Sequence, residues 1–276
     1  MEERYQLLGR LPGGGFGRIS VYFDRQMNQK VVQKALHHPT RENCEDLIRE
    51  GRLYIKLKDE EHIVDLIAYR FDYTDPCLIL PFYEEGTLQT KVGNRNWYDS
   101  IIFVQHAAKG VSALHSEGGF ARDIKPANLF ISKNAQGQRI IKVGDLGLGR
   151  LPYPFTNGDM TRNAFGTPGY MAPELFAPNP QFTPACDIYS LGVTGIELIT
   201  GSRDINSIHS IWINNDVKSL LLRMTSYNPH EGPDAITVVN TIRKIVQAYD
   251  ESFKKVVTVG GLSLLGWLLY KGATSK

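Results

Sequence analysis

Short runs of apolar residues, one of them alternating with polar residues, occur in the first eighty positions and predict β-strands. The clearest runs are 18–23, 30–36 and 77–80. Between the last two, residues 41–57 contain no proline and repeat apolar side chains at near-helical spacing. This pattern predicts a helix whose N-terminus is capped by Thr40.

Beyond about residue 98 the apolar period becomes helical. The predicted helices are 100–115, 185–200 (ended by Gly201) and 234–249. Strands followed by helices favour an α+β fold with two lobes. The change of pattern predicts a β-rich N-lobe over 1–80, a hinge over 81–86 and a helical C-lobe over 87–250.

Composition narrows the class of protein. The 276 residues are 42% hydrophobic and 22% charged, which is typical of a globular chain. With 31 basic and 29 acidic residues the net charge is +2, so nucleic acid is not an expected partner. The three cysteines, far apart in the sequence, indicate neither a disulfide scaffold nor a zinc site. Residues 1–6 lack the apolar run of a secretory signal, and we expect a cytoplasmic protein.

Two features of the N-terminal part suggest a phosphate site. Residues 12–19 read Pro-Gly-Gly-Gly-Phe-Gly-Arg-Ile between two predicted strands, and bare backbone N–H groups of glycines can approach phosphate oxygens. A glycine-rich hairpin without function would look the same. Lys34 ends an apolar strand and Glu50 on the next helix offers a partner, although a lone lysine there is usually just solvated.

Three segments of the C-terminal part carry further polar chemistry. Residues 121–128 read Ala-Arg-Asp-Ile-Lys-Pro-Ala-Asn and present a base, a cation and a metal-binding amide in one loop. A polar turn around Pro126 would explain this octapeptide alone, but not the other two segments. Residues 144–147 place Asp145 directly after an apolar strand, and residues 166–174 end in Ala-Pro-Glu.

The order and spacing of these segments resemble the eukaryotic-type protein kinase family over roughly residues 5–250. The resemblance implies a two-lobed kinase-like fold of the serine/threonine subclass. It implies Mg-ATP-dependent phosphoryl transfer to serine and threonine hydroxyls of proteins, with autophosphorylation, and ATP and Mg²⁺ as cofactors. Thr156 and Thr161 would be candidate phosphorylation sites near Arg122, unless both are ordinary loop residues.

The resemblance also assigns roles to individual residues. Asp123 would accept or orient the substrate hydroxyl proton, and Lys125 would lie near the transferred phosphate. Asn128 and Asp145 would hold Mg²⁺, while Asp187 would brace the catalytic loop. The residues expected around ATP are Leu11, Gly13, Gly14, Gly15, Phe16, Gly17, Ile19, Val32, Lys34, Glu50, Tyr83 and Phe130.

The sequence departs from the family pattern at several points. Pro12 stands at the first loop glycine, Ala121 replaces a histidine, and Leu146 replaces a phenylalanine. Gly232 replaces the arginine that pairs with Glu174, and the late C-lobe is shortened. These departures keep open a second hypothesis, a pseudokinase that acts as a nucleotide-binding scaffold.

The basic and apolar tail, residues 251–276, falls outside the resemblance. Its segment 256–270 has no charged residue and is flanked by lysines. At 1.5 Å per residue a helix of this length is short of the roughly 20 residues that span a bilayer. We expect membrane association through this C-terminal segment, with the kinase domain facing the cytosol; a helix packed on the C-lobe or against a partner is the alternative.

Overall fold

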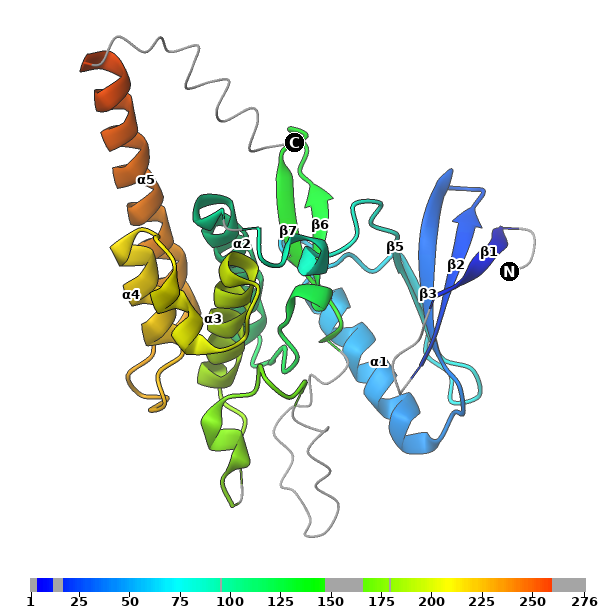
Figure 1. Ribbon diagram of the computed structural model, residues 1–276. Helices are drawn as coiled ribbons and strands as arrows, with labels where there is room; N and C mark the ends of the chain where they lie inside the picture. The colour runs from blue at the N-terminus through cyan, green and yellow to red at the C-terminus, as the bar shows by residue number, and fades with distance from the viewer. Residues whose placement is uncertain (1–3, 12–16, 95, 147–165, 179, 260–276) are drawn as a thin grey trace.

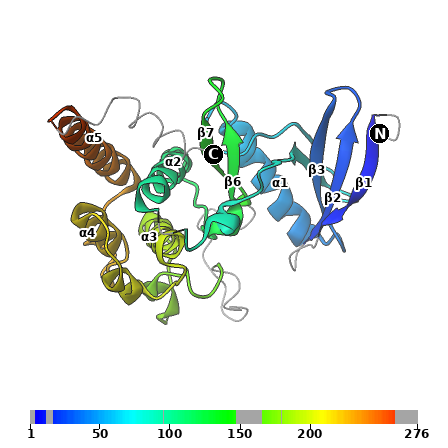
Figure 2. The ribbon, with the colours of Figure 1, turned by 45° about the horizontal axis from the view of Figure 1, so that its top comes forward.

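A computed structural model of the chain describes residues 4–11, 17–94, 96–146, 166–178 and 180–259. An antiparallel sheet forms one end of the molecule and a group of helices forms the other (Figure 1). A two-stranded hairpin lies between them in both ribbon views (Figures 1 and 2). This α+β arrangement confirms the predicted fold class, while the exact limits of the lobes and the hinge stay predictions.

The sheet has five strands in the order β1-β2-β3-β5-β4. Its strands are β1 (Tyr5–Leu11), β2 (Gly17–Asp24), β3 (Gln29–Leu36), β4 (Ala68–Arg70) and β5 (Cys77–Pro81). β2, β3 and β5 match the three predicted runs. Val31 and Ala35 of β3 are almost completely buried, and so are the three successive residues Cys77, Leu78 and Ile79 of β5. Side chains on both faces of β5 are therefore buried, which explains why this run is apolar throughout.

The alternation did not single out β1 and β4. In β1, Leu7, Leu8 and Leu11 remain about half exposed, so the strand has no buried face to leave a pattern. Its pairing with β2 forms it instead, with a register shift between Leu7 and Gly9. β4 has three residues and is formed by its pairing with the buried strand β5.

Helix α1 (Arg41–Lys56) begins where the sequence predicted. The Thr40 hydroxyl accepts a hydrogen bond from Asn43 N, and the Asn43 side chain accepts one from Thr40 N. This reciprocal capping satisfies two backbone groups that the first turn leaves free. Because the start of α1 is fixed, the position of Glu50 along the helix is fixed as well.

Four further helices build the other end of the molecule: α2 (Trp97–Ser116), α3 (Pro184–Thr200), α4 (Asn215–Met224) and α5 (Ala235–Val259). α2 packs against α3, α5 and the hairpin strand β7 (Arg139–Val143). Ala107, Ala108, Val111 and Leu114 are completely buried, so α2 is the centre of this half. α2, α3 and α5 correspond to the predicted helices, and α3 ends at Gly201 as predicted.

The short helix α4 was not predicted from the sequence. Its apolar face is only Val217, Leu220, Leu221 and Met224, a run too brief to stand out from its polar surroundings. Asn214 caps it by accepting hydrogen bonds from Asp216 N and Val217 N. Between α3 and α4 the chain forms one 3₁₀ helix, Ile205–Ser210, which corresponds to the predicted shortening of this region.

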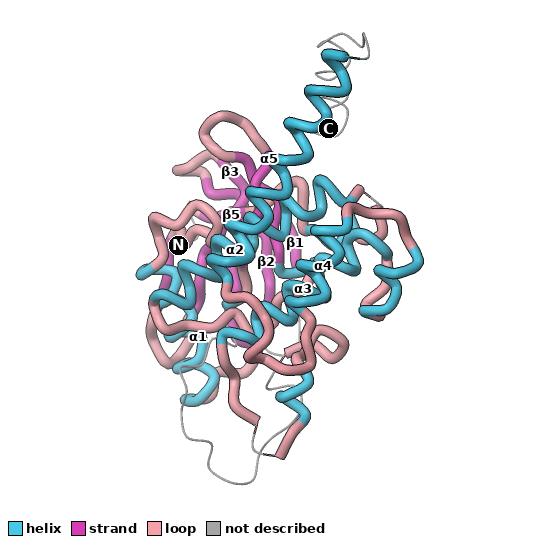
Figure 3. Tube along the Cα trace, turned by 90° about the vertical axis from the view of Figure 1, so that its left-hand side faces the viewer, coloured by secondary structure: helices cyan, strands magenta, loops and turns pink. Residues whose placement is uncertain are grey.

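Helix α5 extends ten residues beyond the predicted end at Tyr249, and its last turns project from the body of the molecule (Figure 3). The first four residues of the expected membrane segment, 256–259, therefore continue α5. Residues 260–270 lie outside the described part of the chain. Within that part, no helix combines the length and apolar character that crossing a membrane requires.

The segment after α1 joins the two halves through β7. Val143 N donates to His62 O (2.8 Å), and Val64 N donates to Val143 O (3.0 Å). The His62 ring stacks on His106 of α2, with ring centroids 4.8 Å apart. His62 Nδ1 donates to Ile141 O (2.9 Å), which holds the ring in place.

This histidine pair makes stability depend on pH. Burial, with the nearby His62 and Lys109, lowers the pKa of His106 to about 3. Between pH 6.5 and 3 the unfolded chain therefore binds a proton at His106 that the folded chain excludes. The free energy of unfolding consequently decreases as the pH is lowered through that window. For one group the slope is at most about 1.4 kcal/mol per pH unit.

We expect His106→Gln to flatten this acid dependence, measured by urea unfolding between pH 7 and pH 4. The control is His209→Gln, because His209 is exposed. An unchanged slope in His106→Gln would contradict the assignment.

Candidate active site

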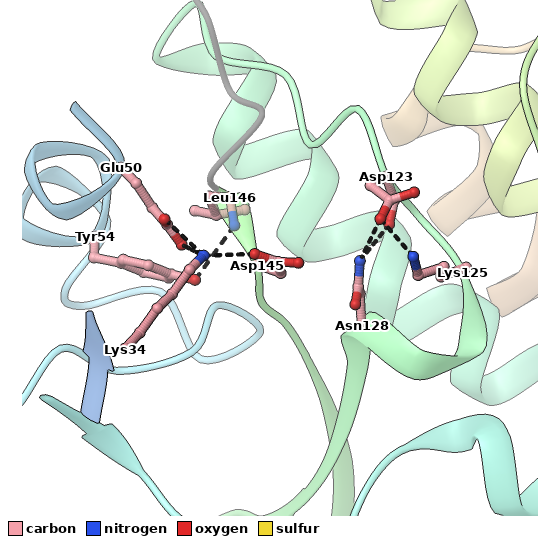
Figure 4. Close-up of polar contacts among 8 residues, drawn as sticks. All are labelled: Lys34, Glu50, Tyr54, Asp123, Lys125, Asn128, Asp145 and Leu146. Carbon is pink, nitrogen blue, oxygen red and sulfur yellow. Dashed lines mark hydrogen bonds and ion pairs between the residues drawn. The ribbon is translucent and has the colours of Figure 1, made fainter. Parts of the chain in front are cut away.

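Lys34 is the centre of the first polar cluster. Its Nζ lies 2.8 Å from both carboxylate oxygens of Glu50 and 2.6 Å from Asp145 Oδ1 (Figure 4). The Glu50 side chain is 1% exposed and that of Lys34 20%. The predicted ion pair between Lys34 and Glu50 is thus present, and a second carboxylate shares the lysine.

Strand register places Lys34 in this position. On β3 it pairs with Ile19 of β2 and Leu78 of β5, so it lies in the centre of the sheet. Val32 is two residues earlier and therefore lies on the same face. Glu50 comes from α1, which packs against β5.

The three groups control each other's ionisation. Burial raises the pKa of Glu50, and the Lys34 ammonium opposes this effect. Burial lowers the pKa of Lys34, but the Asp145 and Glu50 carboxylates outweigh it and raise that pKa above its usual value. The Lys34 charge in turn lowers the pKa of Asp145. Lys34 is therefore a fixed positive charge at neutral pH.

Asp145 follows β7 in a backbone conformation that non-glycine residues seldom adopt, with φ of 54°. The next residue, Leu146, is completely buried, and its N–H donates to the Tyr54 hydroxyl (3.4 Å, Figure 4). Tyr54 is one helical turn after Glu50 on α1 and is itself 1% exposed. α1 thus contacts Leu146 through Tyr54 and is linked to Asp145 through Lys34, which Glu50 and Asp145 share. Tyr54 had no place in the sequence prediction, because an aromatic residue in a helix reads as core.

The second polar cluster surrounds Asp123. Lys125 Nζ donates to Asp123 Oδ2 (2.7 Å), and Asn128 Nδ2 donates to the same oxygen (3.0 Å) and to Asp123 O (2.8 Å). On the other oxygen, Oδ1, Asp123 accepts hydrogen bonds from the backbone N–H (2.9 Å) and hydroxyl (2.6 Å) of Thr167. Lys125 Nζ also reaches Thr167 Oγ1 (2.6 Å). The sequence marked Thr167 only as a sign of subclass, whereas the structure joins it to Asp123.

The hairpin of β6 (Leu129–Lys133) and β7 brings the two clusters to one place. Asn128 directly precedes β6 and Asp145 follows β7 by two residues. Leu129 pairs with Val143, and Gly144 N donates to Asn128 O (3.0 Å). Asn128 and Asp145 therefore lie at the same end of the hairpin, although sixteen residues separate them.

Asp187, at the start of α3, braces the loop that carries Asp123. Its completely buried carboxylate accepts hydrogen bonds from Ala121 N (2.9 Å) and Arg122 N (2.8 Å) and contacts His115 Nε2 (2.9 Å). Arg122 has φ of 63°, and these bonds offset the strain of that conformation. These contacts to the loop are those expected from the bracing role that was predicted for Asp187.

Gly166 brings Thr167 to the same loop. Its φ is 126°, and a Cβ at this position would lie 2.5 Å from Arg122 O. A side chain would therefore push the two segments apart and separate Thr167 from Asp123.

The other residues predicted around ATP lie on neighbouring elements. Val32 pairs with Leu80 across β3 and β5, and Tyr83 follows β5. The rings of Tyr83 and Phe130 are 5.3 Å apart. Leu11 ends β1, and Gly17 and Ile19 lie in β2. Residues 13–16, Thr156 and Thr161 lie outside the described part of the chain.

Three departures from the family pattern have structural counterparts. Ala121 and Leu146 are buried in the main core, where Tyr54 is also buried. Gly232 stands where the family pattern has the arginine that pairs with Glu174. Glu174 instead accepts a hydrogen bond from the Cys186 thiol (3.5 Å). Burial raises the pKa of Cys186 to about 12, so the thiol stays protonated and donates.

The donor set suits Mg²⁺. Mg²⁺ is usually held by one or two carboxylates together with substrate phosphates, not by a cage of protein ligands. Asp145 offers a half-exposed carboxylate, and the Asn128 amide donates its N–H to Asp123, which leaves its carbonyl oxygen for a metal. Among the described residues, no three His, Cys, Asp or Glu side chains form a metal cluster.

Comparison with known proteins gives the class. The family model of the protein kinase domain matches residues 5–256, so the chain belongs to the protein kinase family. Serine/threonine-protein kinase pkn2 of Myxococcus xanthus is 30% identical over 210 residues, 73% of this chain and 25% of the relative. A serine/threonine-protein kinase, drp72, of Corynebacterium efficiens is 31% identical over 212 residues, 72% of this chain and 39% of the relative.

A probable myosin light chain kinase of Dictyostelium discoideum is 29% identical over 207 residues, 73% of this chain and 51% of the relative. The chain thus spans between a quarter and about half of the length of these relatives. The family predicted from the motifs is confirmed. The relatives pkn2 and drp72 are both named serine/threonine-protein kinases, the subclass that the motifs predicted.

Proposed function

We propose that this protein transfers the terminal phosphoryl group of Mg-ATP to serine and threonine hydroxyls of protein substrates, its own chain included. The observation that carries the proposal is the meeting of two clusters at one end of the β6–β7 hairpin. One cluster is a lysine held between two carboxylates, and the other is a carboxylate held by a lysine, an amide and a threonine.

In this proposal each cluster has its own task. Lys34 binds the ATP phosphates and Glu50 holds it in place. Asp145 and Asn128 hold Mg²⁺, which when bound neutralises charge on the phosphates. Asp123 accepts the proton of the attacking hydroxyl, and Lys125 offsets negative charge near the acceptor. Positioning and charge neutralisation supply most of the rate enhancement in this class of reaction.

A direct assay distinguishes an active kinase from the alternative, a pseudokinase that acts as a nucleotide-binding scaffold. The full-length chain is incubated with γ-labelled ATP, Mg²⁺ and a mixed protein substrate, followed by phosphoamino acid analysis. We expect label on serine and threonine, in the substrate and in the chain itself. Nucleotide binding without any transfer would favour the scaffold.

Thr167 is expected to act as a positioning residue. Thr167→Val removes its hydroxyl contacts to Asp123 and Lys125 and should lower kcat by about tenfold or more, the effect of losing a hydrogen bond to a charged group. Thr167→Ser retains the hydroxyl and should retain most of the activity. Steady-state kinetics with peptide and ATP varied separately measure both variants. Equal loss in the two variants would assign Thr167 to folding alone.

The C-terminal segment 256–270 is proposed to hold the protein on a membrane from its cytosolic side. Its support is the sequence: an uncharged apolar run with Trp267 and Tyr270 near one end and lysines on both sides. We expect the full chain to partition with membranes and to need detergent for extraction, whereas a chain ending at Val259 should not. Fractionation measures this, and full-length protein in the supernatant as a monomer would contradict it.

A further inference from the structure

Arg203, just after the end of α3, lies across the segment that carries Thr167. Its Nη1 donates to Pro168 O (3.2 Å), and its guanidinium lies 5.5 Å from the centre of the Tyr170 ring. Gly169 makes this contact close: a Cβ there would lie 2.8 Å from Arg203 Nη1. The site roles assigned from the sequence do not include this arginine.

The guanidinium is near the position of the reacting hydroxyl. Thr167 contacts Asp123 directly, and Gly169 follows Thr167 by two residues. Two Cα steps of 3.8 Å and the contact at Gly169 put the guanidinium within roughly 12 Å of the Thr167 Cα. An extended peptide advances about 3.3 Å per residue. Arg203 is therefore within reach of side chains up to about four residues from a phosphorylated serine or threonine.

Two carboxylates, Glu197 and Asp204, lie near Arg203, and neither removes its guanidinium from solvent. Glu197 lies below, 8% exposed, and accepts a hydrogen bond from the Tyr170 hydroxyl. Its Oε1 is 4.0 Å from Arg203 Nε, the long limit of an ion pair, while the Arg203 side chain is 49% exposed. Asp204 is occupied as a cap and accepts from Asn206 N. The buried carboxylate thus faces the protein and the half-exposed guanidinium faces outward.

We propose that Arg203 makes this kinase prefer substrates with an acidic residue within four positions of the phosphorylated serine or threonine. The proposal rests on the proposed function and adds a substrate class to it. A carboxylate or a phosphorylated side chain can pair with the planar guanidinium, and binding of the peptide lowers the exposure of the pair. A lysine or arginine at the same position is repelled.

The test compares three peptide sets that carry Glu, Ala or Lys at single positions from −4 to +4 around one serine. With the full chain we expect kcat/KM at the selective position to favour Glu over Ala by about fivefold, as for a partly exposed charge pair. Arg203→Glu should reverse the order and favour Lys. Arg203→Lys should retain the acidic preference, and Arg243→Glu, an exposed arginine on α5, should not change it.

A parallel arm measures binding of the same labelled peptides by fluorescence anisotropy. The peptides could bind with an acidic preference that Arg203→Glu reverses and yet receive no phosphoryl group. This result would reject the proposed function and support the role of Arg203 in peptide binding. A wild-type chain without acidic preference in either arm, or an Arg203→Glu chain that retains the wild-type order, would overturn the role of Arg203. Circular dichroism and a thermal melt of each variant confirm that it is folded.

Discussion

Lys34→Met is expected to abolish phosphoryl transfer and to weaken the fold without destroying it. Activity is lost because the substitution removes the ammonium that Glu50 and Asp145 hold, which is the group that we propose binds the ATP phosphates. Stability falls because Glu50, 1% exposed, is left as an unpaired buried charge. Such a loss costs about 3 kcal/mol in the free energy of unfolding at neutral pH.

The stability loss in Lys34→Met has a definite dependence on pH. Burial already raises the pKa of Glu50, and removal of the ammonium raises it further. A group with a raised pKa in the folded state contributes stability at low pH, and this contribution is lost as pH rises through that pKa. Relative to wild type, Lys34→Met should therefore be least stable above neutrality and should recover toward pH 5.

The double variant Lys34→Met/Glu50→Gln separates the two effects. It removes the unpaired charge, so its stability should return toward that of wild type while phosphoryl transfer stays absent. Urea unfolding at several pH values and transfer of labelled phosphate measure the two properties. Normal turnover in Lys34→Met would reject the role of this lysine, and equal stability of the single and double variants would reject the electrostatic account.

Asp123→Asn is expected to lower kcat by about 10²- to 10⁴-fold, the typical contribution of a positioned general base. The amide cannot take up the hydroxyl proton. Thr167 donates two hydrogen bonds to Oδ1, so the amide N–H₂ replaces Oδ2 and meets the donors of Lys125 and Asn128. A small local loss of stability should accompany the loss of rate.

Nucleotide binding distinguishes this variant from a damaged protein. The Lys34 cluster is untouched by Asp123→Asn, so affinity for Mg-ATP, measured by calorimetry, should stay within about threefold of wild type, less than 1 kcal/mol. The control is Asp216→Asn, an exposed aspartate in the first turn of α4, which should not change kcat. Full activity in Asp123→Asn would assign the proton transfer to another group.

The sequence by itself determined the family and the main polar groups. Phosphoryl transfer requires particular residue types. Their order along the chain can be read from the sequence without knowledge of the packing around them. Local rules also fixed the start of α1, because the Thr40 cap and Asn43 are three residues apart. The end of α3 at Gly201 was predictable because glycine readily adopts the left-handed backbone that ends a helix, and Gly201 has φ of 81°.

Tertiary structure alone decided the features that depend on distant partners. β1 has no buried face, and α4 is too short for its apolar stripe to stand out. The Cys186 thiol accompanies Glu174 where the family pattern has an arginine, and Tyr54 joins α1 to Leu146. The position of Arg203 over Gly169 likewise has no local signal, since thirty-three residues separate the two. Such contacts leave no period and no motif, because packing between elements, not the sequence around each residue, selects them.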